Sequence, residues 1–309
     1  MNYKEIGEKF LEKKYQLNMG AGNLAKRYKT TREEIYKAKE YARNFKIVRN
    51  KLPKILIFDI ETAPMKSYIW ARWNQNIHTD DQIISEWFML TWSAKWLFNK
   101  TIYSAKLTSK EAKNQDDKRI TKELWKLLDE ADIVIAHNAE RFDIPHINAR
   151  FLINGLMPVS PFKVIDTLKV VKSQFKFSSN RLDSLAKYFG FEGKLSTGFK
   201  LWADAIEGNK DALDEMSLYN DQDVILLEEV YLKLRPWIKG HPNLALYAES
   251  NDIGCGVCGS KKLTYMDKYY YTQTGKFETY RCECGAINRR RLNSYDKNKK
   301  ENLLIPLQT

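Results

Sequence analysis

An uninterrupted apolar run, Ile55-Leu-Ile-Phe58, leads directly into Asp59-Ile-Glu61-Thr62. Consecutive apolar residues without alternation are typical of a strand that is buried on both faces. Asp59 and Glu61 are two residues apart, so their side chains leave the same face of the predicted sheet. The end of a strand is the usual ligand position in open α/β sheets. Taken alone, the Asp-x-Glu pair could also be a helix N-cap followed by a first-turn acid.

The elements that follow indicate the fold class. Early strands followed by alternating strands and helices predict a mixed β-sheet of the α/β class, flanked by helices. The expected strands after the first are 88–92, 101–106, 133–136 and 163–167. The expected helices are 121–130, 142–152, 181–189 and 212–234, the last one broken near its start.

Two further motifs add carboxylates, each about eighty residues after the one before. His137-Asn138-Ala-Glu-Arg-Phe142-Asp143 supplies a third acid, and Tyr219-Asn-Asp-Gln-Asp223 supplies a fourth. Tyr219 and Asp223 are four residues apart in a predicted helix and therefore share a face. Gathering carboxylates away from water is costly unless cations compensate. An all-oxygen set with open positions suits Mg²⁺ or Mn²⁺.

The ordered motifs resemble those of the 3′–5′ exonucleases of the ribonuclease H-like DEDD superfamily, in the branch with Tyr in the third motif. This group includes the proofreading domains of family B DNA polymerases. The resemblance covers residues 54–240 nearly throughout, including Asp166-Thr167 and the segment 179–186. The segment 62–96 looks most like that of stand-alone, often phage-encoded, predicted exonucleases.

The resemblance implies a role for each matched residue. Asp59, Glu61 and Asp223 would ligate a first Mg²⁺ or Mn²⁺ ion. Asp59 would bridge to a second ion, and Asp143 would act largely through metal-bound water. Tyr219 would orient the attacking water. The implied substrate-binding residues are Thr62, Asn138 and Phe142.

The implied activity is two-metal-ion hydrolysis of phosphodiester bonds at the 3′ end of DNA, single-stranded or frayed. No polymerase motifs follow, so proofreading would be in trans, and replication, recombination or end processing are equally open. An RNA exonuclease or a structure-specific endonuclease on the same fold remains an alternative, because recognition of the 2′-hydroxyl depends on shape. A non-catalytic nucleic-acid-binding module is the alternative of a different class, and the intact carboxylates argue against it.

All four cysteines lie near the C-terminus, and their spacing predicts one local site. Cys255-x2-Cys258 and Cys282-x-Cys284 flank a predicted hairpin of strands 265–272 and 276–281. Four thiolates in such a frame fit a zinc ribbon with one structural Zn²⁺. The second pair has one intervening residue where ribbons usually have two. A redox pair or free thiols are therefore the alternative.

The positive charge lies at the two ends of the chain. The net charge is +12, with a surplus of nine over residues 1–54, a surplus of five over 251–309, and a deficit of two between them. Basic ends flanking an acidic site suggest a polyanionic ligand, nucleic acid. The alternative is that Lys-rich ends are merely solvated. Near the cysteines, Arg289, Arg290 and Arg291 are expected to contact nucleic acid, with a protein-binding ribbon as the alternative.

The first fifty residues predict helices over 5–17, 24–28 and from Thr31 onward, where Thr31 and Glu34 form a capping box. The pattern resembles a helix-turn-helix. Its outward residues, Arg32, Lys37, Lys39 and Arg43, would contact nucleic acid. A helical subdomain that touches only phosphate, or nothing, is the alternative.

We therefore expect three domains: a helical segment at 1–50, the exonuclease-like domain at 51–245, and a zinc ribbon with a basic tail at 246–309. No run approaches eighteen apolar residues and the N-terminus has no apolar core segment, which predicts neither a membrane span nor a secretory signal. The expected location is the cytoplasm of a bacterial or phage-infected cell. A replication or recombination protein is the expected protein partner, and no membrane contact is expected.

Overall fold

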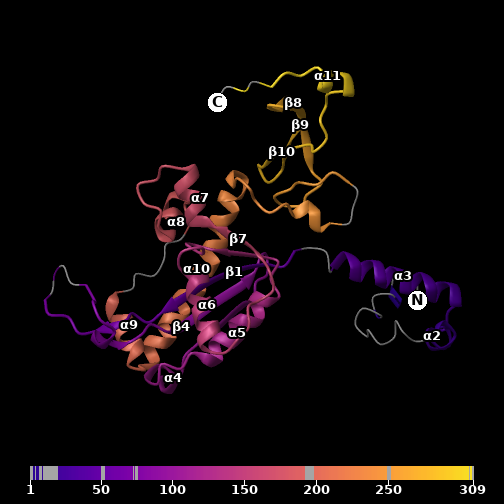
Figure 1. The fold of residues 1–309 in the computed structure, drawn as a ribbon. Coiled ribbons are helices and arrows are strands. Elements are labelled where there is room, and N and C mark those ends of the chain that lie inside the picture. Colours follow the sequence, from indigo (N-terminus) through magenta and orange to yellow (C-terminus); the bar gives the residue numbers. More distant parts are fainter. Residues whose placement is uncertain are drawn as a thin grey trace. The chain divides into compact units, whose positions relative to one another are not determined.

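A five-stranded mixed sheet, in the order β5-β4-β1-β6-β7, is the centre of the main part of the chain (Figure 1). β1 pairs antiparallel with β4 and parallel with β6, so the predicted mixed α/β sheet is confirmed. The strands are β1 Ile55–Thr62, β4 Met89–Trp96, β5 Ile102–Lys106, β6 Ile133–Ala136 and β7 Lys163–Asp166. A separate two-stranded sheet pairs β2 Lys66–Ser67 with β3 Ile83–Ser85.

This computed structural model describes residues 3, 5, 6, 9, 20–49, 53–71, 73, 76–191, 198–248, 252–305 and 307, and over 41–49 it describes the backbone alone. The chain divides into two units, one of residues 1–53 and 243–263 and the other of 54–242 and 264–309. The division into three domains expected from the sequence stays a prediction. No helix in the described part is long and apolar enough to cross a membrane.

The two faces of β1 have different surroundings. Leu56, Phe58 and Ile60 point into an apolar core that includes Leu124 and Ile147 from the helices on that side. The alternate positions face the long last helix, where Asn220 contacts Asp59. A strand's period of two therefore places Leu56, Phe58 and Ile60 on one face of β1 and Ile57, Asp59 and Glu61 on the other, where the two acids follow a buried isoleucine.

The helices around the sheet include the four that the sequence predicts and several that it does not. Those of the main part are α4 Ser109–Lys113, α5 Lys118–Asp129, α6 Asp143–Ile153, α7 Thr167–Gln174, α8 Leu182–Phe189, α9 Phe199–Ile206 and α10 Lys210–Leu234, with 3₁₀ turns at Asp80–Gln82, Arg235–Trp237 and Leu244–Tyr247. The expected break near the start of α10 is wrong. Asn209 caps this helix by accepting hydrogen bonds from the amides of Asp211 and Ala212, so it runs unbroken from Lys210.

α10 is fixed to β4 by buried polar contacts. The hydroxyl of Ser93 donates to Asp221, and Lys95 forms an ion pair with Glu228. Glu228 also accepts from the amide of Phe98 at 2.7 Å. These contacts set which face of α10 lies over the sheet. They also give Asp221 a structural role, which the sequence left unassigned.

The N-terminal helices that the structure describes are α2 Ala21–Tyr28 and α3 Arg32–Arg49. Leu24, Ile35 and Ala38 form a small core with Ile6. The predicted capping box is half correct: Thr31 accepts from the amide of Glu34 at 3.2 Å, but the carboxylate of Glu34 accepts from the Thr30 hydroxyl instead. Most of the helix expected at 5–17 lies outside the described residues.

A three-stranded sheet follows the main part, in the order β10-β9-β8. Its strands are β8 Leu263–Thr272, β9 Gly275–Cys282 and β10 Ile287–Arg289, and a short helix, α11 Lys297–Glu301, comes after them. The two strands of the predicted hairpin correspond to β8 and β9. β10 was not predicted, because three residues are too few to show a pattern.

The ion pair of Arg150 with Asp117 should contribute strongly to stability. Asp117 is fully buried and also accepts from the amide of Met89 and from Asn154. Arg150→Met leaves this charge poorly compensated, so we expect the free energy of unfolding to fall by roughly 3 kcal/mol. Urea denaturation measures the loss. The matched control is Lys54→Met, which removes the exposed pair with Glu130 and should cost about 1 kcal/mol or less. Equal losses in the two variants would contradict the assignment.

Candidate active site

Three of the four predicted acidic residues meet at the end of β1. One carboxylate oxygen from each of Asp59, Glu61 and Asp223 lies within 4.8 Å of the others. Asp59 and Glu61 come from the face of β1 that is turned toward α10, and Asp223 comes from α10. The alternation of side chains along β1 and the attachment of α10 to β4 together bring these three acids into one group.

Asn220 orients the first of these acids, and the sequence did not single it out. Its side-chain amide donates to Oδ2 of Asp59 at 3.1 Å, and the residue is fully buried. Asn220 precedes Asp223 by three positions, so both lie on the same side of α10. Helical spacing within the third motif was therefore the signal that could have identified it.

Asp143 lies at the first position of α6 and outside the 4.8 Å group. It is 1% exposed, and neither carboxylate oxygen has a hydrogen bond of normal geometry. Burial raises the pKa of Asp143 to about 7, against the opposing effect of its own backbone amide. The negative charges of Asp166 and Glu61 add to the rise, and the amide of Ile60 lowers the pKa least of all. A buried acid with this pKa becomes an anion at neutral pH most easily next to a cation.

The other predicted residues around the acids are placed differently. Tyr219 is buried on α10, with its ring edge-to-face with Trp202, and it lines the same cleft as Asp59. Phe142 also lines the cleft and packs on His146. Thr62 is the last residue of β1, after a bulge, and it is not among the residues that line the cleft.

Asn138 has a left-handed backbone, with φ of +83°. Its amide donates to Asp166 at 3.1 Å, as does the amide of Glu140. Asp166 also accepts from the amides of Leu168 and Lys169 at the start of α7. One nearly buried carboxylate thus joins the loop of the second motif to α7, and it holds Asn138 in a conformation that is uncommon for a residue with a side chain.

His137 makes structural contacts. Its Nε2 donates to the carbonyl of Asn180 at 3.0 Å, and its Nδ1 lies 2.9 Å from the hydroxyl of Thr167. Both ring nitrogens therefore have protein partners. His137 also lines the cleft that holds the acids, and sequence reasoning assigned it no role in the site.

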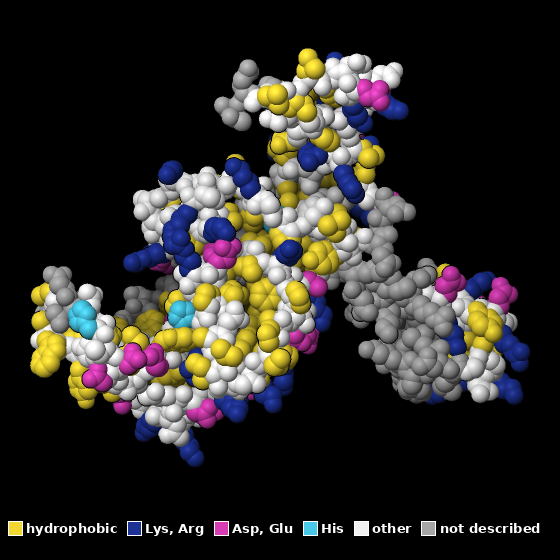
Figure 2. Space-filling model, in the orientation of Figure 1, with side chains coloured by type: hydrophobic (Ala, Val, Ile, Leu, Met, Phe, Trp, Pro, Cys, Tyr) yellow, Lys and Arg dark blue, Asp and Glu magenta, His cyan; other side chains and the backbone are white. Residues whose placement is uncertain are grey.

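A cleft of about 900 Å³ surrounds the acidic group. Asp59, Glu61 and Asp223 line one part of it. α7, α8 and the segment between them line another, with Lys172, Arg181 and Lys187. Sequence reasoning did not assign these cations. Figure 2 shows Lys and Arg side chains gathered over α7 and α8.

The residues present fit divalent metal ions. The donors are all carboxylate oxygens, the ligands that Mg²⁺ and Mn²⁺ prefer. Three of these carboxylates are close enough to share one ion, and the buried Asp143 is near enough to Glu61 for that charge to raise its pKa. Asp59, Glu61, Asp143 and Asp223 would hold such ions.

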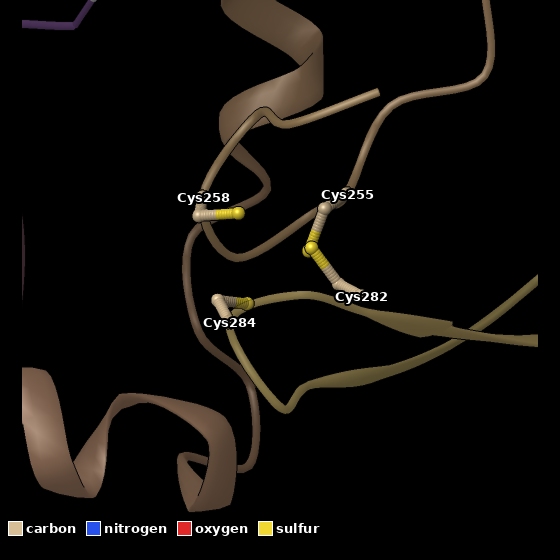
Figure 3. A group of neighbouring side chains, drawn as sticks. All are labelled: Cys255, Cys258, Cys282 and Cys284. Carbon is tan, nitrogen blue, oxygen red and sulfur yellow. The ribbon is translucent and has the colours of Figure 1, made fainter. Parts of the chain in front are cut away.

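The four cysteines form a second candidate metal centre. Their sulfurs lie within 4.8 Å of one another, and Figure 3 shows the side chains turned toward a common centre. Gly259 and Gly285, which follow the two cysteine pairs, have φ of +74° and +90°. The amide of Val257 donates to the sulfur of Cys255 at 3.4 Å. Turns and amide-to-sulfur bonds of this kind fit a tetrahedral Zn²⁺.

The predicted nucleic-acid contacts at the two ends of the chain have varied surroundings. Arg32 and Lys37 are exposed, and Lys37 pairs with Glu33. Lys39 is half-buried, and the side chain of Arg43 lies outside the description. Arg289, Arg290 and Arg291 are exposed, the first over the ring of Phe277 and the second near Glu278.

A comparison with known families finds a match in the central part of the chain. A family model of the RNase_H superfamily matches residues 94–235, which is less than half of the chain. Together with the five-stranded mixed sheet, this match supports an RNase H-like fold. The match includes Asp143, Tyr219 and Asp223, whereas Asp59 and Glu61 on β1 precede it. No curated protein matches the chain.

Among solved structures, the chain is similar to the family B DNA polymerase from the hyperthermophilic archaeon Pyrobaculum calidifontis. The sequence identity is 17% and the TM-score is 0.40. The similarity covers 64% of this chain and 27% of the polymerase. The chain therefore spans little more than a quarter of that protein.

Asp166 should control the order of the second-motif loop. Asp166→Asn places an amide NH₂ against backbone N–H groups, so we expect the amides of Asn138 and Glu140 to exchange with deuterium at least tenfold faster. Hydrogen exchange with mass spectrometry measures the rates. Asp129→Asn is the control, because Asp129 also accepts a backbone amide, that of Ser160, but on another loop. Unchanged exchange at 138–140 would exclude this role for Asp166.

The buried Asp143 makes stability depend on pH in the metal-free protein. Below about pH 4 the carboxyl is protonated both folded and unfolded. From there to about pH 7 only the unfolded chain loses the proton, so stability falls as pH rises, by up to roughly 4 kcal/mol. Asp143→Asn should remove this loss of stability. The difference in free energy of unfolding between the variant and the wild type should reach its full value above pH 7. Urea denaturation in EDTA from pH 4 to 8 tests it. Parallel curves for the two proteins would contradict the buried, perturbed carboxyl.

Proposed function

We propose that the protein is a metal-dependent 3′–5′ exonuclease that removes nucleotides from single-stranded or frayed DNA ends. The observation that carries the proposal is the convergence of Asp59, Glu61 and Asp223 within 4.8 Å, in a cleft that Tyr219 also lines. The RNase H-like fold supports a nuclease, and the three sequence motifs support the exonuclease class. A cleft of about 900 Å³ is large enough for a terminal nucleotide.

The chain's residues divide the work in this proposal. Two bound divalent ions would supply Lewis-acid stabilisation of charge on the attacked phosphate and on the leaving oxygen. Asp59, Glu61, Asp143 and Asp223 hold the ions, and Asn220 fixes the rotamer of Asp59. Tyr219, one helical turn before Asp223, orients the attacking water through its hydroxyl. Asn138 and Phe142 position the terminal nucleotide against these groups, and Thr62 at the end of β1 assists.

The biological setting is part of the same proposal. The partner is nucleic acid, with DNA favoured over RNA, and a replication or recombination protein would deliver the end. The cell compartment is the cytoplasm. The N-terminal helices and the ribbon, as separate domains, would hold the strand. An RNA exonuclease, a structure-specific endonuclease or a binding module without turnover are the outcomes against which this is tested.

Loss of one metal ligand should strongly slow cleavage. Asp59→Asn or Asp223→Asn should lower the rate about 10³-fold, because several kcal/mol of transition-state stabilisation disappear, while strand binding stays within a few-fold. The assay is a time course with 5′-labelled single-stranded DNA and its RNA counterpart, in Mg²⁺ or EDTA. A ladder that shortens from the 3′ end identifies the exonuclease. The strand that is degraded faster shows whether the enzyme prefers DNA or RNA.

Asp221→Asn is the matched control for this experiment. It carries the same change two residues away on α10, and an Asn oxygen can still accept from Ser93. It should cleave at nearly the wild-type rate. Equal loss in Asp221→Asn and Asp223→Asn would mean that α10, and not the acid, was damaged. Strands that are retarded but uncut by the wild type under every metal would favour the binding module.

We also propose that Cys255, Cys258, Cys282 and Cys284 bind one structural Zn²⁺. Atomic emission should find one zinc per chain, and Cys284→Ser should lower that content. Because a short ribbon draws its folding energy from the metal, chelation should remove amide protection in β9 and β10 but not in β1. A chain that contains no zinc, yet keeps β9 and β10 protected, would exclude the proposal and favour a redox pair or free thiols.

A further inference from the structure

Three cations share the cleft with the acidic group, and neither the sequence motifs nor the family match gives them a role. Lys172 comes from α7, Arg181 precedes α8 as its N-cap residue, and Lys187 comes from α8. All three are exposed. From residue 172 to 191 the chain carries four Lys or Arg and one Asp. Residues 172–191, from the end of α7 to just past α8, therefore form a locally basic wall of the cleft, on which Asp183 is the one acid.

The cations of this wall lack the partners that similar residues have elsewhere. In the same unit, Lys95, Lys106 and Lys169 form ion pairs with Glu228, Asp214 and Glu140. Lys172, Arg181 and Lys187 pair with no acid in the part of the chain that the structure describes. Unpaired cations around a cleft focus positive potential into it and attract anions.

The wall is held in place by contacts that do not use these charges. Phe177 stacks on Phe175 and on Tyr188, with ring centroids 5.4 and 5.3 Å apart. Asp166 caps α7, and the carbonyl of Asn180 accepts from His137. The charged ends can therefore bind a ligand without being needed for the fold. This arrangement allows each of them to be neutralised by substitution.

We propose that Lys172, Arg181 and Lys187 bind the phosphodiester backbone of the substrate strand, on the 5′ side of the bond that is cut. The inference rests on the proposed function and adds the part of the substrate that this site recognises. The carboxylates and their metals would take the terminal phosphate. The preceding phosphates then have to be neutralised by protein, and these three cations are the groups in the cleft that can do so. Contacts to phosphate position the strand and do not read its sequence.

Binding in EDTA tests the wall independently of turnover, because a metal-dependent reaction does not run there. The variant is the triple Lys172→Gln, Arg181→Gln and Lys187→Gln. The control removes the same charge from α5 by Lys118→Gln, Lys122→Gln and Lys126→Gln, three exposed lysines that do not line the cleft. Fluorescence anisotropy with a labelled 12-nucleotide dT strand gives the dissociation constant between 50 and 200 mM salt.

Each phosphate contact contributes about 0.7 to the slope of log affinity against log salt for a single strand, so three lost contacts lower the slope by about 2. The cleft variant should bind more than tenfold more weakly at low salt, and the α5 variant should resemble the wild type. Equal slopes and affinities in the two triple variants would overturn the inference, whether or not the protein is an exonuclease.

Turnover separates this inference from the proposed function. On the 12-nucleotide strand, kcat/KM of the cleft variant should fall at least tenfold. On the p-nitrophenyl ester of thymidine 5′-monophosphate, which has no preceding phosphates, it should stay within twofold. An equal loss on both substrates would assign the cations to the reaction itself and overturn the inference. A wild type that cleaves neither substrate would refute the proposed function, and the binding slopes would still decide the role of the wall.

Discussion

The alternation of side chains along β1 is the constraint on which the rest of the site depends. Its apolar face closes the core with α5 and α6, so the strand cannot slip by one residue without burying Asp59 and Glu61. Its other face, which carries the two acids, lies under α10, whose rotation is set by the contacts of Ser93 and Lys95 with acids on that helix. With strand and helix both fixed, Asp223 has one place to lie, beside the two acids of β1. The packing of the core and the grouping of the carboxylates are thus one arrangement.

The strand and helix faces that carry the acids could be predicted from short-range patterns in the sequence. The apolar run of β1, the spacing of Asp59 and Glu61, and the helical spacing of Tyr219 and Asp223 each specify a face without knowledge of the rest of the chain. The spacing of the four cysteines likewise predicted that their sulfurs lie together. In contrast, the unbroken start of α10 depends on one capping side chain, Asn209, whose effect a periodicity argument does not include.

The residues that were missed act over long distances in the sequence. Asp166 binds amides 28 and 26 residues away, and Asn220 reaches Asp59 across 161 residues. The grouping of Lys172, Arg181 and Lys187 depends on how α7 and α8 pack beside the cleft. The charges of this segment can be counted in the sequence, but the sequence does not show which surface they face. The site as proposed therefore combines acids that would bind metal ions with cations that would bind phosphate, and only the folded chain keeps the two groups apart.

In the proposed reaction, Asp59, Glu61, Asp143 and Asp223 hold two divalent ions that act on a 3′ end. Anomalous diffraction from crystals grown with Mn²⁺ and thymidine 5′-monophosphate, the product of that reaction, would locate these ions. We expect two manganese peaks roughly 4 Å apart at these carboxylates, with the nucleotide phosphate between them and its base in the cleft. Clear anomalous density elsewhere in the crystal, with none at the four carboxylates, would contradict the proposal.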